Sequence, residues 1–401
     1  MGLVVLALRD DARHADLSGR ATAELPDRAG ATAELLFRLR GALVRRNEAR
    51  LAKLADPDLP ESAQELADLA ANVQALHIGR LDLQYLDQSA LALSAEERAR
   101  YGPGAWVSEV QLSWRFRGVD PAVSTIEVPI VTDWDGERAV FATSRTTGDY
   151  RVPLWLTERV AVRRSPTTLV LAGDPGQARS LARQARTAVT VVRRTLPGWH
   201  EPLVVEAPAS DVDFRSGAGM SRPASRTIAA VTTTTDGSRL ATAPVHVFLN
   251  PAVFDPLGPE GRQIVLSHEA THVALGAATT ASLPLWLSEG IADYVALVGN
   301  PLPDTVLAAQ IRRLVQEDGA PKALPGPAEF AGSNTDIGAW YEAAWLAVRL
   351  IAETYGRPAL LEFYSRAEAD KDTRAAFRQV LGTTEAQFRR AWQARLVELA
   401  G

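Results

Sequence analysis

The sequence contains no cysteine. Disulfide bonds and cysteine-ligated metal sites are therefore excluded, and any bound metal has to be held by histidine and carboxylate side chains. Lysine is almost as scarce, because Lys53, Lys322 and Lys371 are the only lysines among 43 basic residues and the others are arginine. Acidic residues are interspersed among the arginines and no basic block stands out, so we expect no nucleic-acid partner.

Long apolar runs are also missing. No segment reaches the ~20 apolar residues that span a bilayer. Residues 2–8 are apolar, but no basic residue precedes Arg9, so they lack the basic n-region that is typical of a signal peptide. Two interpretations of residues 1–29 stay open. They are a frayed segment or first strand, or they are the stub and tether of a membrane anchor, which would favour a membrane-anchored or extracytoplasmic location over a cytoplasmic one.

The chain has 401 residues, of which 46% are apolar, and this length predicts two domains. The predicted N-terminal domain covers residues 30–155. Apolar residues at helical spacing predict helices over 31–54 and 61–76. Alternating apolar and polar residues then predict antiparallel strands at 77–86, 106–119, 124–132 and 138–143, with a hairpin turn at Asp135-Gly136. This order of elements indicates an α+β domain with a curved sheet.

The predicted second domain covers residues 156–401. Its first part is a small sheet with a helix at 174–194 and strands at 160–162, 167–171, 202–206, 226–234 and 244–249. The remainder is predicted to be helical.

The segment that follows the last strand carries the clearest chemical pattern. His268-Glu269-Ala270-Thr271-His272 is H-E-x-x-H within an apolar run that is compatible with a helix. Residues four apart share one helix face, so both histidines can bind one zinc ion. Glu269, which is turned about 100° from His268, would lie beside the metal as a base for its water.

A catalytic zinc needs a third protein ligand and one open position. Glu289 in the next predicted helix is our candidate for the ligand, and Gly290 would let another backbone approach. Asp293, one turn later, would accept the outer N–H of a ligating histidine. The reverse assignment, with Asp293 as the ligand and Glu289 in support, also stays open.

These residues resemble a known family. His268-Glu269-x-x-His272 with Trp286-Leu287-Ser288-Glu289-Gly290-Ile291-Ala292-Asp293-Tyr294 is similar to the gluzincin metallopeptidases, in particular the peptidase MA-like domain related to M1 and M61 catalytic domains. The resemblance covers about residues 156–401. It implies that His268, His272 and Glu289 bind zinc and that Glu269 is the general base. It also implies that Asp293 supports a ligating histidine without binding the metal itself. Residues 30–150 resemble the NTF2-like cone fold in the order of their elements.

The family also carries a tyrosine on a later helix, and Tyr341 matches it. The resemblance implies that its hydroxyl donates to the oxyanion of the tetrahedral intermediate. The alternative is that Tyr341 is an aromatic residue of the core that packs beside Trp340 and Trp345.

One departure from the family limits the resemblance. M1 aminopeptidases hold the free amino terminus of the substrate with a G-x-M-E-N strand, which this sequence lacks. The strand at 244–250 could pair with substrate, and His246 on it either contacts substrate or is an ordinary strand histidine. We therefore expect a peptide or protein substrate and an endopeptidase rather than an aminopeptidase. The alternative function is a non-catalytic binding protein of the cell envelope that uses the N-terminal cone, with a structural or vestigial zinc site.

Overall fold

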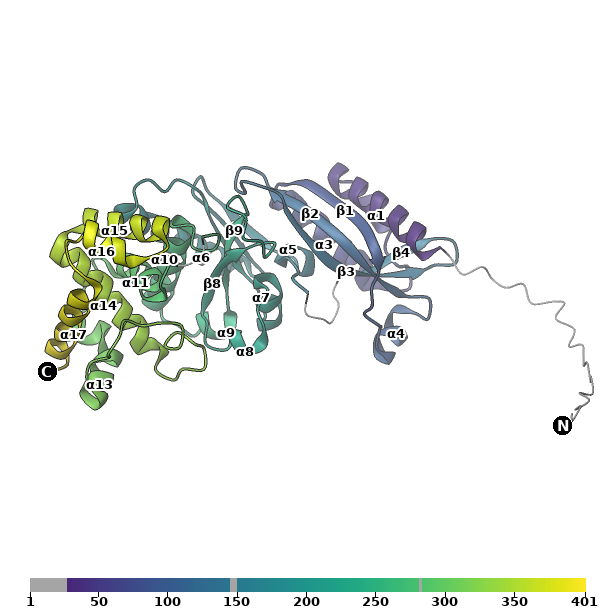
Figure 1. Cartoon of the computed structure of the whole chain (residues 1–401). Helices are drawn as coiled ribbons and strands as arrows, with labels where there is room; N and C mark the ends of the chain where they lie inside the picture. The colour runs from purple at the N-terminus through teal and green to yellow at the C-terminus, as the bar shows by residue number, and fades with distance from the viewer. Residues whose placement is uncertain (1–26, 145–149, 281–282) are drawn as a thin grey trace, which may run out of the picture.

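The computed structural model describes residues 27–144, 150–280 and 283–401, and it confirms the α+β class (Figure 1). An N-terminal domain of helices and an antiparallel sheet lies at one end, a mixed sheet lies in the middle and a helical region lies at the other end. The predicted tether or anchor stub lies outside the described residues except for residues 27–29. Within the described ranges, no helix combines the length and apolar character needed to cross a membrane.

The N-terminal domain begins with α1 (Arg28–Arg45), α2 (Glu48–Ala52) and α3 (Pro60–Ala75). The sequence predicted one helix over residues 31–54, and the structure divides it in two. Arg46 has a left-handed backbone with φ of 56°, which ends α1, and the Asn47 side chain accepts from the backbone of Arg50 to cap α2. The second predicted helix is confirmed as α3.

The four predicted strands are confirmed as β1 (Ile78–Gln88), β2 (Trp106–Phe116), β3 (Ser124–Trp134) and β4 (Ala139–Thr143). They are antiparallel neighbours in the order β1-β2-β3-β4, and the unpredicted helix α4 (Ala95–Tyr101) joins β1 to β2. The Asp135 carboxylate accepts hydrogen bonds from the backbone of Glu137 and Arg138, which fixes the β3–β4 turn. Leucines of α1 share one buried core with alternate residues of the sheet, including Val110 and Leu112.

The middle sheet contains β5 (Ala161–Arg164), β6 (Thr168–Ala172), β7 (Leu203–Ala207), β8 (Ala230–Thr234) and β9 (Val245–Leu249). Its order is β5-β6-β7-β9-β8. The three inner strands run parallel, β5 and β8 pair antiparallel with their neighbours, and α6 (Pro175–Thr195) crosses between β6 and β7. The last strand in the sequence, β9, is therefore internal, and β8 forms the edge.

Both faces of this sheet are buried. Val170, Val205 and Val247 join the core of the helical region. Leu169 and Val204, next to them in sequence, point the opposite way into the core of the N-terminal domain. The predicted boundary between residues 155 and 156 falls within α5 (Leu154–Thr157), so the division into two domains remains a prediction.

The helical region is built around α10 (Pro259–Ala274), α11 (Leu285–Leu297) and α14 (Ile337–Tyr355). The other helices after β7 are α7 (Asp211–Ala218), α8 (Arg222–Ser225), α9 (Pro251–Phe254), α12 (Asp304–Leu307), α13 (Ala309–Asp318), α15 (Arg357–Asp370), α16 (Thr373–Gln379) and α17 (Glu385–Ala400). Helices α11 and α14 touch at Gly290. A Cβ atom there would collide with the carbonyl oxygen of Ala344 and lie 2.7 Å from Val348 Cγ2. The predicted close approach at Gly290 is confirmed.

Candidate metal centre

Helix α10 presents His268 and His272 on one face, one turn apart. Their Nε2 atoms lie 3.0 Å apart, and their ring planes cross at 78°. Both side chains are largely buried, with 13% and 11% of their surface exposed. Two ring nitrogens at this separation can share a proton in a hydrogen bond, or both can turn a lone pair towards one cation.

Glu289 approaches the pair from α11. Its Oε2 lies 3.4 Å from the Nε2 atom of each histidine. The three atoms therefore form a triangle with edges of 3.0, 3.4 and 3.4 Å. Ligands on a tetrahedral zinc, with bonds of about 2.0–2.1 Å, lie roughly 3.3 Å from one another. His268, His272 and Glu289 thus form a group that could hold a metal ion.

Asp293 contacts the other side of the same histidine ring. Its Oδ1 lies 2.7 Å from His268 Nδ1. If Nδ1 carries the proton and donates it to this carboxylate, Nε2 is left as an acceptor that faces Glu289. This arrangement favours Glu289 over Asp293 as the third ligand.

The charges around the pair are predominantly negative. Burial opposes protonation of His268, but Asp293, Glu289 and Glu269 together raise its pKa well above its usual value. Burial would raise the pKa of Glu289, but the two histidines hold it well below its usual range. Three carboxylates thus surround two histidines, and a bound cation would compensate this charge.

Glu269 lies next to the histidines and is 7% exposed. Its Oε2 accepts a 2.6 Å hydrogen bond from the hydroxyl of Thr232 in the edge strand β8. Thr232 was not predicted from the sequence. Residues 232–235 are four consecutive threonines, and strand alternation alone could have divided them into two faces. It could not have shown which face meets α10.

The group opens into a pocket of about 330 Å³. Glu269, Tyr341 and the β8 residues Ala230, Val231 and Thr232 line it with the three candidate ligands. The Tyr341 ring, from α14, meets the His268 ring edge to face at 6.1 Å and packs on Phe330. Burial, followed by the charges of Glu289, Asp293 and Glu269, raises the pKa of the Tyr341 hydroxyl, which keeps it protonated. The structure thus brings Tyr341 to the pocket.

His246 lies elsewhere. It is 1% exposed, and both ring nitrogens contact carboxylates: Nδ1 lies 2.6 Å from Glu206 Oε1 and Nε2 lies 3.0 Å from Asp120 Oδ1. Asp120 belongs to the N-terminal domain, so this cluster joins that domain to the middle sheet. Burial lowers the pKa of His246, but the two carboxylates outweigh it and raise the pKa to about 9.

The register of β8 and β9 explains this position. Thr232 pairs with Val247, and both face α10, whereas His246 pairs with Thr233 on the opposite face. The expectation that the strand at 244–250 pairs with substrate is wrong, because β9 has a neighbour on each side. The ring of His246 faces away from the pocket, with no route to a substrate there.

Comparison with known protein families and with curated proteins gives no match for this chain.

Proposed function

We propose that the protein is a zinc-dependent metallopeptidase. The observation that carries the proposal is the group His268, His272 and Glu289 at the wall of an open pocket, with Glu269 beside it. Zinc bound by these side chains would lower the pKa of a coordinated water towards ~7 and polarise the scissile carbonyl. The ligand set and the motif agree with the resemblance to gluzincins.

Glu269 would act as the general base. It would take a proton from the attacking water and pass it to the leaving amine. The hydroxyl of Thr232, 2.6 Å from Glu269 Oε2, would fix the position of this carboxylate. The Tyr341 hydroxyl would donate a hydrogen bond to the oxyanion of the tetrahedral intermediate, since its raised pKa keeps the hydroxyl protonated.

An endopeptidase fits the pocket better than an aminopeptidase. Glu269 and Glu289 are the carboxylates among the described residues that line it, and both have roles in the proposed mechanism. Neither is free to bind an amino terminus. The edge strand β8 runs along the same pocket, and an extended peptide could add to it as a further strand.

The alternative is a non-catalytic binding protein with a structural zinc site and a functional N-terminal cone. The order of helices and antiparallel strands in that domain supports the NTF2-like resemblance. Structural zinc sites, however, have four protein ligands and no access to solvent. Three candidate ligands at an open pocket support catalysis instead.

The test compares wild type with Glu269→Gln, each loaded with one zinc ion, on a broad peptide library. We expect cleavage by wild type and a loss of about 10²–10⁴-fold in the variant, with zinc content unchanged. Cleavage within chains whose amino termini are blocked would identify an endopeptidase. Equal rates for the two proteins would refute the proposal, and cleavage of non-peptide esters alone would reassign the substrate class.

A further inference from the structure

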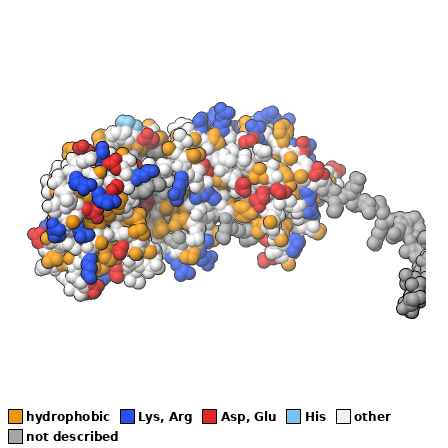
Figure 2. Space-filling view, viewed as in Figure 1, with side chains coloured by type: hydrophobic (Ala, Val, Ile, Leu, Met, Phe, Trp, Pro, Cys, Tyr) orange, Lys and Arg blue, Asp and Glu red, His pale blue; other side chains and the backbone are white. Residues whose placement is uncertain are grey.

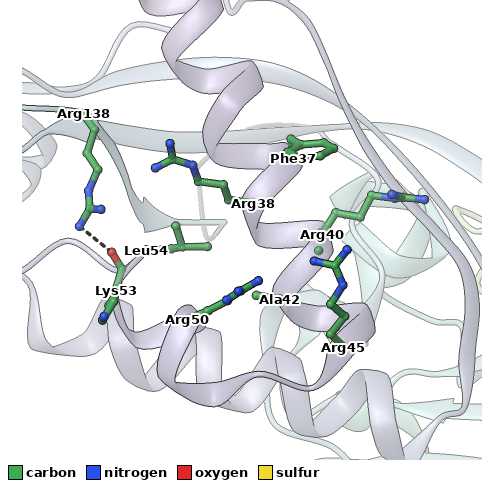
Figure 3. A pocket seen from close by; sticks show the side chains of 10 residues that line it. Phe37, Arg38, Arg40, Ala42, Arg45, Arg50, Lys53, Leu54 and Arg138 are labelled. Atoms are coloured by element: carbon green, nitrogen blue, oxygen red, sulfur yellow. Dashed lines mark hydrogen bonds between the residues drawn. The ribbon is translucent and has the colours of Figure 1, made fainter.

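A second cavity, of about 360 Å³, lies in the N-terminal domain between α1 and α2 (Figure 3). Six basic side chains line it: Arg38, Arg40, Arg45, Arg50, Lys53 and Arg138. No basic block stood out in the sequence, but residues 38–53 contain Arg46 in addition to the first five of these and a single acidic residue, Glu48. The turn between α1 and α2 gathers them around one cavity, and the β3–β4 hairpin adds Arg138.

Three of the six cations already have partners. Arg38 pairs with Glu34 at 2.7 Å and Arg40 pairs with Asp82 at 2.9 Å, but each of these four side chains is at least 44% exposed. Exposed pairs are worth little and exchange readily. Arg138 donates to the carbonyl oxygen of Lys53 at 3.0 Å, which ties the hairpin to the end of α2 (Figure 3).

Arg45, Arg50 and Lys53 are different. Across the described residues, none of the three has an acidic partner within ion-pair distance. The chain as a whole carries a net charge of −5. Three unpaired cations around one cavity in an acidic protein form a local positive potential that a bound anion would neutralise.

The cavity also has apolar walls. Ala42, Leu54 and the ring of Phe37 line it. Phe37 is 69% exposed, and Val44, two turns later on α1, is 57% exposed. Figure 2 shows basic side chains gathered along the upper edge of this end of the molecule. The site therefore offers several cations next to an apolar surface.

We infer that this cavity binds the phosphoryl group of a small phosphate ester. A carboxylate is satisfied by one bidentate arginine, whereas a phosphate monoester carries a charge near −2 and three acceptor oxygens. Unpaired cations from α1 and α2 supply donors for such a group from different directions. The ester carbon chain would lie against Phe37 and Leu54. The source is either a soluble phosphate ester or the headgroup of an anionic lipid, which share this chemistry.

This inference does not rest on the proposed peptidase function. The cavity belongs to the N-terminal domain, whereas the candidate metal ligands lie on α10 and α11. Glycerol 3-phosphate and phosphatidic acid in phosphatidylcholine vesicles are the two probes. Titration of the full chain with glycerol 3-phosphate tests the soluble source, and sedimentation with the vesicles tests the lipid source, both at about 0.15 M salt.

The main variant is the triple substitution Arg45→Gln, Arg50→Gln and Lys53→Gln. Its matched control is Arg179→Gln, Arg183→Gln and Arg186→Gln, at a second arginine-lined cavity of about 320 Å³ between β5 and α6. A further variant, Gly41→Leu, would fill the first cavity and keep its charge. A Cβ atom at Gly41 would meet only Arg45 Nη1, at 3.8 Å, so we expect this variant to fold.

We expect at least one probe to bind wild type, with a loss of about 100-fold in the main variant and about tenfold in Gly41→Leu. The control should bind like wild type. Binding of vesicles alone would identify an anionic lipid as the source of the phosphoryl group. Binding of glycerol 3-phosphate as well would identify a soluble phosphate ester. No binding of either probe, equal losses in both triple variants, or tighter binding of duplex DNA than of the probe that binds would overturn the inference.

Discussion

Among the residues that the structure describes, two buried clusters combine histidine with carboxylates, and they differ in geometry rather than composition. At the candidate metal centre, the Nε2 atoms of two histidines and one oxygen of Glu289 lie within 3.4 Å of one another at the wall of a pocket. Where the N-terminal domain meets the middle sheet, the ring of His246 lies between Asp120 and Glu206, so each nitrogen faces a different carboxylate. The first arrangement can hold a metal ion. In the second arrangement, a ring that carries two protons donates one hydrogen bond to each carboxylate.

The comparison predicts that the interface cluster serves stability. His246→Ala would leave Asp120 and Glu206 buried without their partner, and this should cost about 3–5 kcal/mol of unfolding free energy. Chemical denaturation measures the loss. The exposed His200 provides the control, and His200→Ala should change stability by less than ~0.5 kcal/mol. A small effect of His246→Ala would break the comparison.

The same cluster predicts a dependence on pH. The pKa of His246 is raised to about 9 in the folded protein, from 6.5. Its contribution is therefore fully present below about pH 6.5 and is lost as pH rises through about 9, a decrease of roughly 3 kcal/mol. Unfolding measured across this range should show the decrease in wild type. His246→Ala should remove this part of the slope, and an unchanged slope would contradict the assignment.

At the metal centre, substitution of the aspartate is expected to affect metal binding rather than stability. Asp293→Asn should weaken zinc affinity by about 10–100-fold, because the amide orients the His268 ring less well than the carboxylate does. Asp120→Asn should destabilise the fold and leave zinc affinity unchanged. Titration with zinc and denaturation of both variants give a crossed comparison. Equal effects of the two substitutions on zinc affinity would show that the clusters are not independent.

The smallest effect concerns the two faces of β8. Thr232→Val removes the hydroxyl that contacts Glu269 and should lower the rate of peptide hydrolysis about tenfold at unchanged zinc content. Thr233 lies on the opposite face and pairs with His246. Thr233→Val should leave the rate unchanged. A loss of rate in Thr233→Val alone would mean that the face assignment of the strand is wrong.

Much of this architecture could be predicted from local patterns. The change from helical spacing to alternation located the strands of the first sheet, and the H-E-x-x-H spacing located two histidines on one helix face. Gly290 was predicted to allow a close approach, and it contacts α14. The break between α1 and α2 was missed, because the left-handed backbone of Arg46 carries no signal such as glycine.

The sequence by itself determined which residues share a face of one element, because helix and strand periodicities are properties of the local backbone. The pairing of His268 with His272 is of this kind. Only the tertiary structure decided which elements meet. Strand order made β9 internal and β8 the edge, so Thr232 contacts Glu269 while His246 is enclosed between Asp120 and Glu206. Such contacts join residues 37 to 126 positions apart, and their choice depends on how whole faces bury each other.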